Sequence, residues 1–326
     1  MTALASEAAT TAPTTQPPSA RDKWRRRGPL LPALVFTIII TQIPFLLTIA
    51  ISTLHWNILQ PGEKSFLGLG SYQSFAGLSN YATVFSDARL RNAVVNTVVL
   101  TTSVVVISVL IGLALAILLD KRFPGRGLAR TLLIAPFLVM PVAAALLWKH
   151  ALYNPDYGLF NGVLNWIWQL FGAEEGPTID YVSRWPMPSV IAALVWQWTP
   201  FMMLILLAGL QSQPGDVLEA AKIDRASSFQ TFRFITLPHL RQYIELSALL
   251  GSIYVLQTFD AIFTITQGGP GSATTNLPYE IYLTTFRKFE YGEAAAAGVV
   301  TVIATIIVAT FALRTISSLF KEEVSR

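Results

Sequence analysis

Two pairs of polar residues, each three positions apart, mark a charged stretch at residues 214–238 between two apolar runs. Asp216 is followed by Glu219, and Ser227 is followed by Gln230. At this spacing, each side chain of a pair accepts a hydrogen bond from the backbone N–H of the other residue, which satisfies two donors at a helix start. The pattern therefore predicts two short amphipathic helices, with Asp216 and Ser227 as their N-caps.

The two predicted helices meet near Asp224-Arg225-Ala226. We expect the second helix to end at Pro238, because proline interrupts the helical hydrogen-bond ladder. A charged pair of helices between two apolar runs favours contact with a partner outside the membrane.

The sequence lacks the groups that carry most enzyme chemistry. It contains no cysteine, and its three histidines, His55, His150 and His239, are scattered. A disulfide, a thiolate metal site, a cysteine nucleophile and an HExxH zinc site are thereby excluded. Residues 62–65 approach a nucleotide-binding GxxxxGK[ST] loop but lack its spacing. We predict no catalytic residue, metal site or bound cofactor on this chain, so any ATP and Mg²⁺ that drive it belong to a partner.

Ionisable residues within the apolar runs are few, and each is a functional candidate because a charge in hydrocarbon is costly. Asp260 lies near the end of the run at 240–265, where Gly251, Tyr254 and Thr258 recur at helical spacing on one face. This face and Asp260 are predicted to line a polar substrate path. The alternative is that Asp260 sits at the membrane interface and pairs with a neighbour.

A second group of candidates lies in the apolar run at 189–210. Gln197, Trp198 and Phe201 combine aromatic faces with an amide group. A sugar needs this combination, because its C–H faces pack on rings while its hydroxyls need donors and acceptors. Tryptophans near the end of a span are also ordinary interface anchors. The anchor interpretation is favoured for Trp196, and both interpretations stay open for Trp198.

Membrane-spanning helices must position these candidates. The chain has 53% hydrophobic and 13% charged residues, which indicates an all-α integral membrane protein. A span needs about 20 apolar residues. Residues 1–27 are predicted to be a disordered basic tail, and the first apolar run lacks a cleavage signature and is expected to remain as an anchor. The six predicted spans cover residues 30–54, 92–119, 128–151, 189–210, 240–265 and 293–313.

The basic residues indicate how these spans are oriented. Sixteen of the 23 Lys and Arg residues lie in the N-terminal segment, in the loops at 121–130 and 222–241, and at the C-terminal end. Because cytoplasmic loops are enriched in Lys and Arg, both termini and residues 214–238 are predicted to be cytoplasmic. The net charge of +4 is spread over short loops between apolar runs, which argues against nucleic acid as a partner.

On the opposite side, residues 157–171 carry many aliphatic and aromatic residues, among them Trp166 and Trp168. The pattern predicts an amphipathic helix that lies along the membrane interface. The alternative is that this helix supports a docked partner.

Residues 214–238 resemble the EAA loop of permease subunits from binding-protein-dependent ABC importers. That pattern runs EAA, two residues, DGA, and later an aromatic-rich segment that closes with I-x-L-P. It is matched here by Glu219, Ala220, Ala221, Asp224, Ala226, Phe229, Phe232, Ile235, Leu237 and Pro238. Arg225 occupies the place of the usual glycine, and a positive φ there would cost about 1 kcal/mol.

Further segments resemble the carbohydrate importers within this family. They are Leu69-Gly70, Leu78-Ser79-Asn80-Tyr81, Arg91 to Thr97, Thr266 to Gly271, and Tyr291-Gly292. The resemblance extends from about residue 30, and the chain is similar to the subunit type represented by the larger maltose-transporter permease. It implies a type I importer permease fold with six transmembrane helices: 28–91 as the first helix and outer loop, 92–315 as the core permease domain, and 316–326 as a cytoplasmic tail.

The resemblance also implies partners and roles. In that family two different permeases pair, two ATPase subunits dock on the EAA loops, and an extracytoplasmic solute-binding protein delivers a sugar or polyol. Here the ATPase contact falls on the residues from Glu219 to Phe232 that match the pattern, together with Arg225. The expected location is the bacterial cytoplasmic membrane.

Together these observations predict the permease subunit of an ATP-driven importer of a sugar or polyol. The alternative from another class is an ion-coupled secondary transporter. That class relies on intramembrane ionisable groups and often on internal repeats, and the sequence offers Asp260 alone as a candidate and no clear repeat.

Overall fold

The computed structural model of the chain describes residues 31–60, 72–172, 174 and 176–324. The chain divides into two compact units, Met1–Ala50 and Ile51–Arg326. The predicted basic tail at 1–27 and the segment Leu69-Gly70 lie outside the described residues.

Helix α2 (Leu31–Ser52) accounts for the first predicted span, and its residues 31–50 make up the described part of the first unit. It is long and apolar enough to cross a membrane. The hydroxyls of Thr37, Thr41 and Thr48 donate to carbonyls four residues earlier at 2.8, 2.7 and 2.9 Å. Their polar groups are thus satisfied within the helix, as a lipid environment requires.

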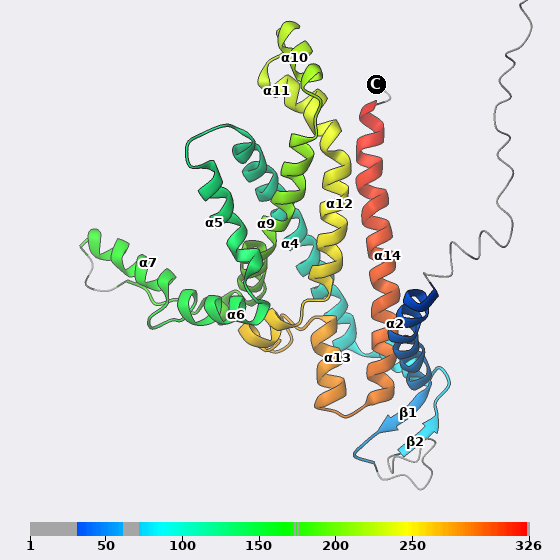
Figure 1. Cartoon of the computed structure of the whole chain (residues 1–326). Helices are drawn as coiled ribbons and strands as arrows, with labels where there is room; N and C mark the ends of the chain where they lie inside the picture. The colour runs from blue at the N-terminus through cyan, green and yellow to red at the C-terminus, as the bar shows by residue number, and fades with distance from the viewer. Residues whose placement is uncertain (1–30, 61–71, 173, 175, 325–326) are drawn as a thin grey trace, which may run out of the picture. The chain divides into compact units, whose positions relative to one another are not determined.

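Three long helices form the centre of the second unit: α4 (Ala88–Asp120), α9 (Pro186–Gln211) and α12 (Leu237–Leu256). They pack against one another over much of their length (Figure 1). The large side chains that they bury completely include Leu100, Met202, Met203, Leu206 and Leu207.

Glycines allow these helices to approach closely. A Cβ on Gly112 of α4 would lie 3.0 Å from the backbone nitrogen of Met203, and a Cβ on Gly251 of α12 would overlap Cε of Met202. Small residues are enriched where membrane helices meet, because they bring the backbones together. Gly251 therefore faces the packed interior between α12 and α9.

Two further helices complete this group. Helix α14 (Tyr291–Val324) runs beside α12 and α13 (Leu277–Phe286) (Figure 1). It contains the predicted sixth span and continues through most of the predicted tail at 316–326. No periodic pattern predicts α13, which begins where the Asn276 side chain accepts a hydrogen bond from the Tyr279 backbone at 3.1 Å.

A small antiparallel hairpin departs from the predicted all-α class. It consists of β1 (Leu54–Asn57) and β2 (Tyr72–Phe75), with Leu54 opposite Phe75. Helix α3 (Ser79–Ser86) holds the hairpin, because the Asn80 amide donates to the carbonyls of Ser52 and Leu54 at 2.9 and 2.8 Å.

The predicted span at 128–151, which contains Pro136 and Pro141, is interrupted in the structure. Helix α5 (Arg126–Leu138) is followed by α6 (Pro141–Leu146), and the π-helical η2 (Leu147–Leu152) continues α6 at an angle of 97° to α5. Pro141 is the first residue of α6, and Met140 before it has ψ 135°. A proline disfavours helical geometry in the preceding residue, which explains the position of the break.

The predicted span at 240–265 is also interrupted. Helix α12 ends at Leu256, and helical turns resume at Asp260 before the π-helical η4 (Ile262–Thr266). In the break, the carbonyl of Thr258 accepts a hydrogen bond of 2.5 Å from the Asn276 amide. Residues 252–267 contain neither proline nor glycine, so a contact from a distant segment holds this break.

By length and hydropathy, three of the described helices qualify as membrane spans: α2, α4 and α9. The bent pair of α5 with α6 and η2 would add a fourth. The apolar described part of α14, Tyr291–Ile307, is shorter. The total of six spans therefore stays a prediction.

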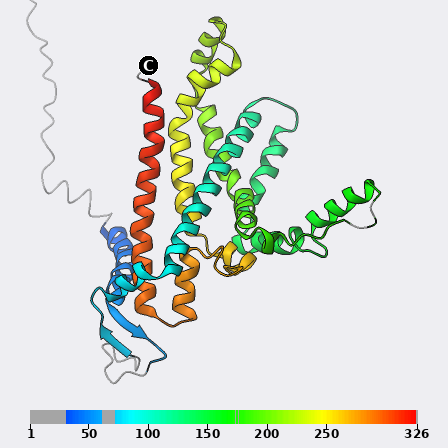
Figure 2. The ribbon, with the colours of Figure 1, turned by 180° about the vertical axis from the view of Figure 1, so that it is seen from behind.

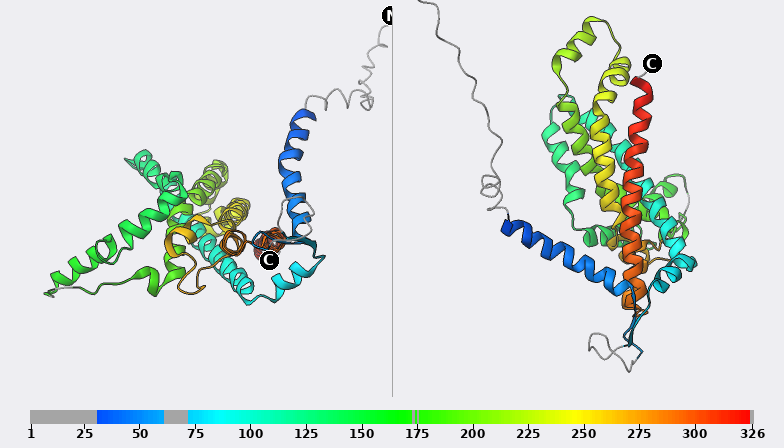
Figure 3. Two further views of the ribbon diagram at one scale, coloured as in Figure 1. Left: turned by 90° about the horizontal axis from the view of Figure 1, so that it is seen from below. Right: turned by 90° about the vertical axis from the view of Figure 1, so that its right-hand side faces the viewer.

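The helix predicted within 157–171 is present as α7 (Leu159–Leu170). It runs crosswise to α9 and α12 (Figures 1 and 2) and points away from them in the view from below (Figure 3). Its base is fixed by Phe160, whose ring lies 5.6 Å from that of Tyr153. Burial raises the pKa of the Tyr153 phenol to about 12. The interfacial role of α7 stays a prediction.

A short helix, α8 (Tyr181–Arg184), returns the chain from α7 to α9. Asp180 caps it, because its carboxylate accepts a hydrogen bond of 3.0 Å from the Ser183 backbone. Hydrogen bonding to Ser183 lowers the pKa of Asp180 below its ordinary value, since the bonds favour the charged form.

Candidate functional site

Four aromatic rings from three helices form a group that we call the ring cluster: Phe137 of α5, Trp198 and Phe201 of α9, and Tyr254 of α12. Trp198 stacks on Tyr254 with centroids 5.3 Å apart, and Phe137 stacks on Phe201 at 5.4 Å. Three edge contacts at 5.8 to 6.1 Å close the group. Tyr254 is 50% exposed, so the cluster presents an aromatic surface that a ligand can reach.

The ring cluster joins three of the residues predicted to line a substrate path. Trp198 and Phe201 both contact the ring of Tyr254, although 53 positions separate Phe201 from Tyr254. Sequence reasoning missed Phe137, which lies beside Pro136 in a run that reads as an ordinary span. The one available signal was its position next to a helix-distorting proline.

Gln197 has a structural partner. It is 7% exposed, and its amide donates to the carbonyl of Val139 at 3.3 Å. Val139 lies in the break between α5 and α6, where the helical ladder is interrupted. Gln197 therefore satisfies a carbonyl that the break leaves open, which a buried polar group requires.

The predicted continuous face of Gly251, Tyr254 and Thr258 is wrong, because α12 ends before Thr258. Gly251 packs against Met202, and Thr258 lies in the break that follows Leu256. Asp260 is half-buried at the first helical turn after this break. Of that predicted set, only Tyr254 belongs to the ring cluster.

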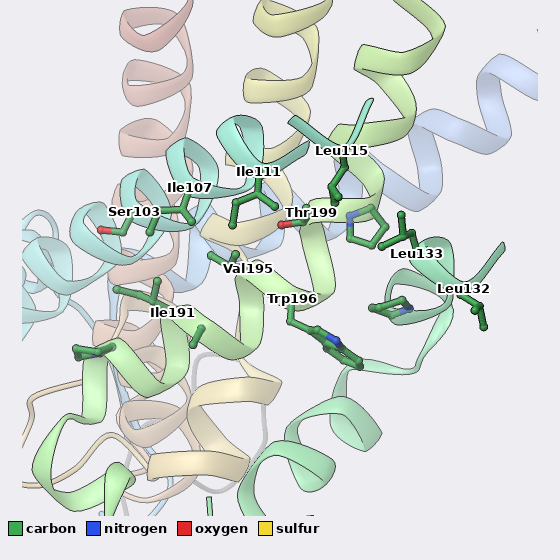
Figure 4. Close-up of a pocket in the computed structure, with 14 residues that line it drawn as sticks. Ser103, Ile107, Ile111, Leu115, Leu132, Leu133, Ile191, Val195, Trp196 and Thr199 are labelled. Atoms are coloured by element: carbon green, nitrogen blue, oxygen red, sulfur yellow. The ribbon is translucent and has the colours of Figure 1, made fainter. Parts of the chain in front are cut away.

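An apolar groove lies between α4, α5 and α9, with a volume of about 780 Å³ (Figure 4). Its lining includes Ile111 of α4, Leu132 of α5 and Trp196 of α9, and its polar side chains are Ser103 and Thr199. With so few polar groups it lacks the donors and acceptors that a sugar needs. Trp196 lines this apolar groove, and its role as an interface anchor stays a prediction.

Residues 214–238 fold as two helices joined by a sharp corner, at the end of α9 and α12 (Figure 1). The first is α10 (Gly215–Ile223) and the second is α11 (Ser228–Thr231). The capping box of Ser227 with Gln230 is confirmed, at 3.3 and 2.7 Å. The predicted N-cap at Asp216 is wrong, because α10 begins at Gly215 and Asp216 lies in its first turn.

The corner after α10 is a Schellman turn. The Ala226 N–H donates to the Ala221 carbonyl at 3.0 Å, and the Arg225 N–H donates to the Lys222 carbonyl at 3.1 Å. This turn places its central residue in the left-handed region, where glycine is preferred. Arg225 has φ +58°, so it adopts the strained conformation that the resemblance pointed to.

The outer surface of the corner is apolar and exposed. Ile223 is 81% exposed, Phe229 68% and Phe234 69%. Phe232, also predicted for this surface, is half-buried. Glu219, Ala220 and Asp224 are exposed, whereas Ala221 is buried. Sequence reasoning missed Ile223 and Phe234, because helical spacing alone does not tell which apolar side chains a corner turns outward.

The prediction that Pro238 ends the second helix is wrong. Helical structure continues from Ser228 through the π-helical η3 (Phe232–Thr236) into α12. Pro238 lies in the first turn of α12, directly after this wider turn. Proline has no N–H, so one backbone carbonyl of the preceding turn loses its usual donor. The wider π-type turn changes which N–H each carbonyl accepts from, so the helix can continue past the proline.

Residues 108–321 match the family described as the inner membrane component of binding-protein-dependent transport systems. The chain belongs to this family. It is therefore a permease component of such a transport system, and the alternative of an ion-coupled secondary transporter has no support. Both the corner at residues 214–238 and the ring cluster fall within the matched region.

Relatives of the permease cover most of its length. It is 36% identical to a probable ABC transporter permease protein, y4oQ, of Sinorhizobium fredii, over 82% of this chain and 81% of the relative. It is 33% identical to the trehalose/maltose transport system permease protein MalF of Thermococcus litoralis, over 87% and 90%. It is 32% identical to the sn-glycerol-3-phosphate permease protein UgpA of Agrobacterium fabrum, over 77% and 83%.

A solved structure shares the fold. A chain of a bacterial ABC transporter involved in the import of the acidic polysaccharide alginate superposes with a TM-score of 0.73 at 20% identity. The match covers 91% of this permease and 96% of that chain. The permease therefore has the type I ABC importer fold, built from membrane-spanning helices.

Proposed function

We propose that this permease moves a sugar or polyol through the bacterial inner membrane, driven by ATP that partner subunits hydrolyse. The observation that carries the proposal is the exposed apolar corner of residues 214–238, on a chain of a transport family whose relatives include a trehalose/maltose permease. A transport subunit that has no nucleotide-binding loop of its own needs a surface on which an ATPase can act.

The ring cluster supports a neutral polyhydroxy substrate. Aromatic faces such as that of the half-exposed Tyr254 pack against the C–H surface of a sugar ring. In the described part of the chain, the cation–ring contacts are Arg184 with Trp185 and Arg233 with Phe234, and neither involves the cluster. A phosphorylated substrate needs cationic partners, so we place glycerol phosphate behind sugars and polyols.

Lys149 is a basic residue of η2, the last part of the bent third segment, and it has a structural partner. Its amine donates to the Thr264 carbonyl of η4 at 2.8 Å. This bond joins η2 to η4, and it gives the Lys149 amine a partner within the protein. The arrangement supports the preference for an uncharged substrate.

For the ATPase contact, the corner offers the chemistry of a docking site. Ile223, Phe229 and Phe234 supply exposed apolar anchors, and Glu219 supplies an exposed charge beside them. Interfaces draw most of their binding energy from a few such anchors that become buried. We assign Glu219 to a polar group of the ATPase, and the apolar anchors to a cleft on its surface.

The orientation of the permease follows from the same assignment. The corner, the end of α14 and the turn between α4 and α5 lie at one end of the second unit (Figure 1). This end carries the basic loops, which supports a cytoplasmic location for it and for both termini. A second permease subunit, two ATPase subunits and an extracytoplasmic solute-binding protein complete the proposed transporter, with ATP and Mg²⁺ on the ATPases.

Transport in this proposal is alternating access. Closure of the ATPases on ATP moves the corner, and the packed group of α4, α9 and α12 transmits the motion as a rigid body. The substrate path then opens toward the binding protein on one side or toward the cytoplasm on the other. A ligand shifts a conformational equilibrium only when it binds the two states with different affinities. ATP must therefore bind one of these two states of the transporter more tightly.

The test is charge reversal at Glu219 in the complete transporter. Glu219→Lys should leave membrane insertion intact and reduce uptake of radiolabelled trehalose and maltose to background, while ATP hydrolysis no longer responds to the binding protein. Glu174→Lys, an equal charge change in an exposed outer loop, serves as the control and should transport normally. Normal uptake by Glu219→Lys at normal expression would refute the coupling role.

A further inference from the structure

The C-terminal end of α9 has carbonyls that the helix itself cannot satisfy, as every helix end does. The Ala208 carbonyl accepts from the Ser212 backbone at 3.0 Å, and the Leu210 carbonyl accepts from the Gln213 backbone at 3.4 Å. The Gly209 carbonyl between them accepts instead from side chains: Ser212 Oγ at 2.9 Å and His239 Nε2 at 3.1 Å. His239 lies near the start of α12, so one helix caps the other.

The donors and acceptors at this point fit one arrangement. A carbonyl can only accept, so His239 must carry a proton on Nε2 to bond to Gly209. Ser212 donates its proton to the same carbonyl and accepts from the Tyr243 hydroxyl at 2.7 Å. The His239 Nε2 is also 3.1 Å from Ser212 Oγ. We call the group of Ser212, His239 and Tyr243 the clasp.

The backbone allows the clasp to close. A Cβ on Gly209 would lie 2.6 Å from the Tyr243 ring and 2.9 Å from Cδ2 of Leu240, so only glycine permits this approach. A second link lies beside it, where the Thr236 hydroxyl donates to Gln213 Oε1 at 3.2 Å. The two stems of the corner, at residues 212–213 and 236–243, are thus joined side by side.

We infer that the clasp positions the corner so that motion of α10 reaches α9 and α12 together. On one side the chain runs from α9 through residues 212–214 into α10, a short non-helical joint. On the other side, helix continues from Ser228 to Leu256. Without the clasp, a pull on α10 would bend the joint at 212–214, and α9 would lag behind α12. This inference rests on the proposed coupling function of the corner.

The test compares two substitutions that differ only in where they place an amide. His239→Gln puts an N–H donor near the position of Nε2, whereas His239→Asn puts it near Nδ1 and too far from Gly209. Tyr243→Phe keeps the ring and removes the hydroxyl. Gln242→Ala, at an exposed position on the same turn, is the control.

The first measurement is the distance between spin labels on the corner and on α9, because these are the two parts that the joint at 212–214 separates. The chain contains no cysteine, so Val217→Cys on α10 and Ala192→Cys on α9, both at exposed positions, give clean labelling. In the assembled transporter in nanodiscs, the distance distribution should be narrow for the native clasp, for His239→Gln and for Gln242→Ala. It should broaden for His239→Asn and Tyr243→Phe. Equal widths for His239→Gln and His239→Asn would overturn the inference.

The second measurement is uptake of radiolabelled trehalose and maltose per ATP hydrolysed. We expect His239→Asn to lower this ratio by about threefold or more, and His239→Gln to restore it. A lowered ratio with an unchanged distance distribution would also overturn the inference, because the effect would then not arise from the joint. The distance measurement needs no substrate, so it tests the clasp even if the proposed substrate class is wrong.

Discussion

The corner at residues 214–238 and the ring cluster both hold aromatic residues that the sequence marks as functional, but they differ in how those residues are packed. In the corner, Phe229 and Phe234 are more than two-thirds exposed and have few neighbours in this chain. In the ring cluster, every ring contacts at least two others from the same group.

This difference supports two different proposed functions. Exposed aromatic side chains are costly in water, and they favour a surface that a partner covers. Rings that already contact one another hold the shape of a site, and only the remaining free face is available to a substrate. The first region should therefore lose association when it is altered, and the second should lose stability and substrate binding together.

The largest effect is expected at the corner. Phe229→Ser removes an exposed anchor, so affinity for the ATPase subunits should fall by about tenfold or more, while the thermal stability of the free permease stays unchanged. Co-purification at graded salt and a melting curve measure the two quantities. If the free permease lost stability by the same free energy as the complex loses affinity, Phe229 would count as a packed residue, and the corner would no longer differ from the ring cluster.

A smaller effect is expected in the ring cluster. Trp198→Ala removes contacts with Tyr254, Phe137 and Phe201, at about 0.5–1.5 kcal/mol for each ring pair. We expect the melting temperature of the detergent-solubilised permease to fall and the apparent KM for uptake to rise. Trp198→Phe keeps a ring and should recover most of both. A lowered melting temperature with an unchanged KM would show that the cluster is structural only.

The packing of α12 against α9, next to the ring cluster, should be less sensitive. The Cβ in Gly251→Ala would overlap the flexible end of Met202, so the side chain must move, at a cost of about 1–3 kcal/mol. The double variant that combines Gly251→Ala with Met202→Ala should recover part of the lost stability, because the shorter side chain at position 202 makes room for the new Cβ. Thermal melting of Gly251→Ala, Met202→Ala and the double variant measures the stability of each. An unchanged melting temperature for Gly251→Ala would mean that α12 and α9 are not tightly packed at this point.

The smallest effect concerns the strain at Arg225. Arg225→Gly removes a left-handed conformation that costs about 1 kcal/mol in a non-glycine residue. Part of this gain is lost, because glycine gives the unfolded chain more conformational freedom. We expect a rise in thermal stability of less than about 1 kcal/mol and unchanged uptake. A clear loss of uptake would mean that the Arg225 side chain itself contacts the ATPase.

Parts of both regions could be predicted because they depend on neighbours in the sequence. The capping box of Ser227 with Gln230 needs only a spacing of three residues, and it forms as predicted. Trp198, Phe201 and Tyr254 could be chosen by residue type within apolar runs. The N-cap of α10 was misplaced by residue type, because Asp216 fits the pattern while the helix begins at Gly215.

The sequence by itself determined the membrane-protein class, most of the helical runs and the lack of cysteine-based chemistry, because these follow from composition, local periodicity and the absence of cysteine. The tertiary structure decided where the helices break and which side chains meet. Asn276 holds the break after α12, Phe137 completes the ring cluster, and His239 caps α9. Each of these contacts joins residues at least 18 positions apart, and local patterns carry no information on which distant partner a side chain reaches.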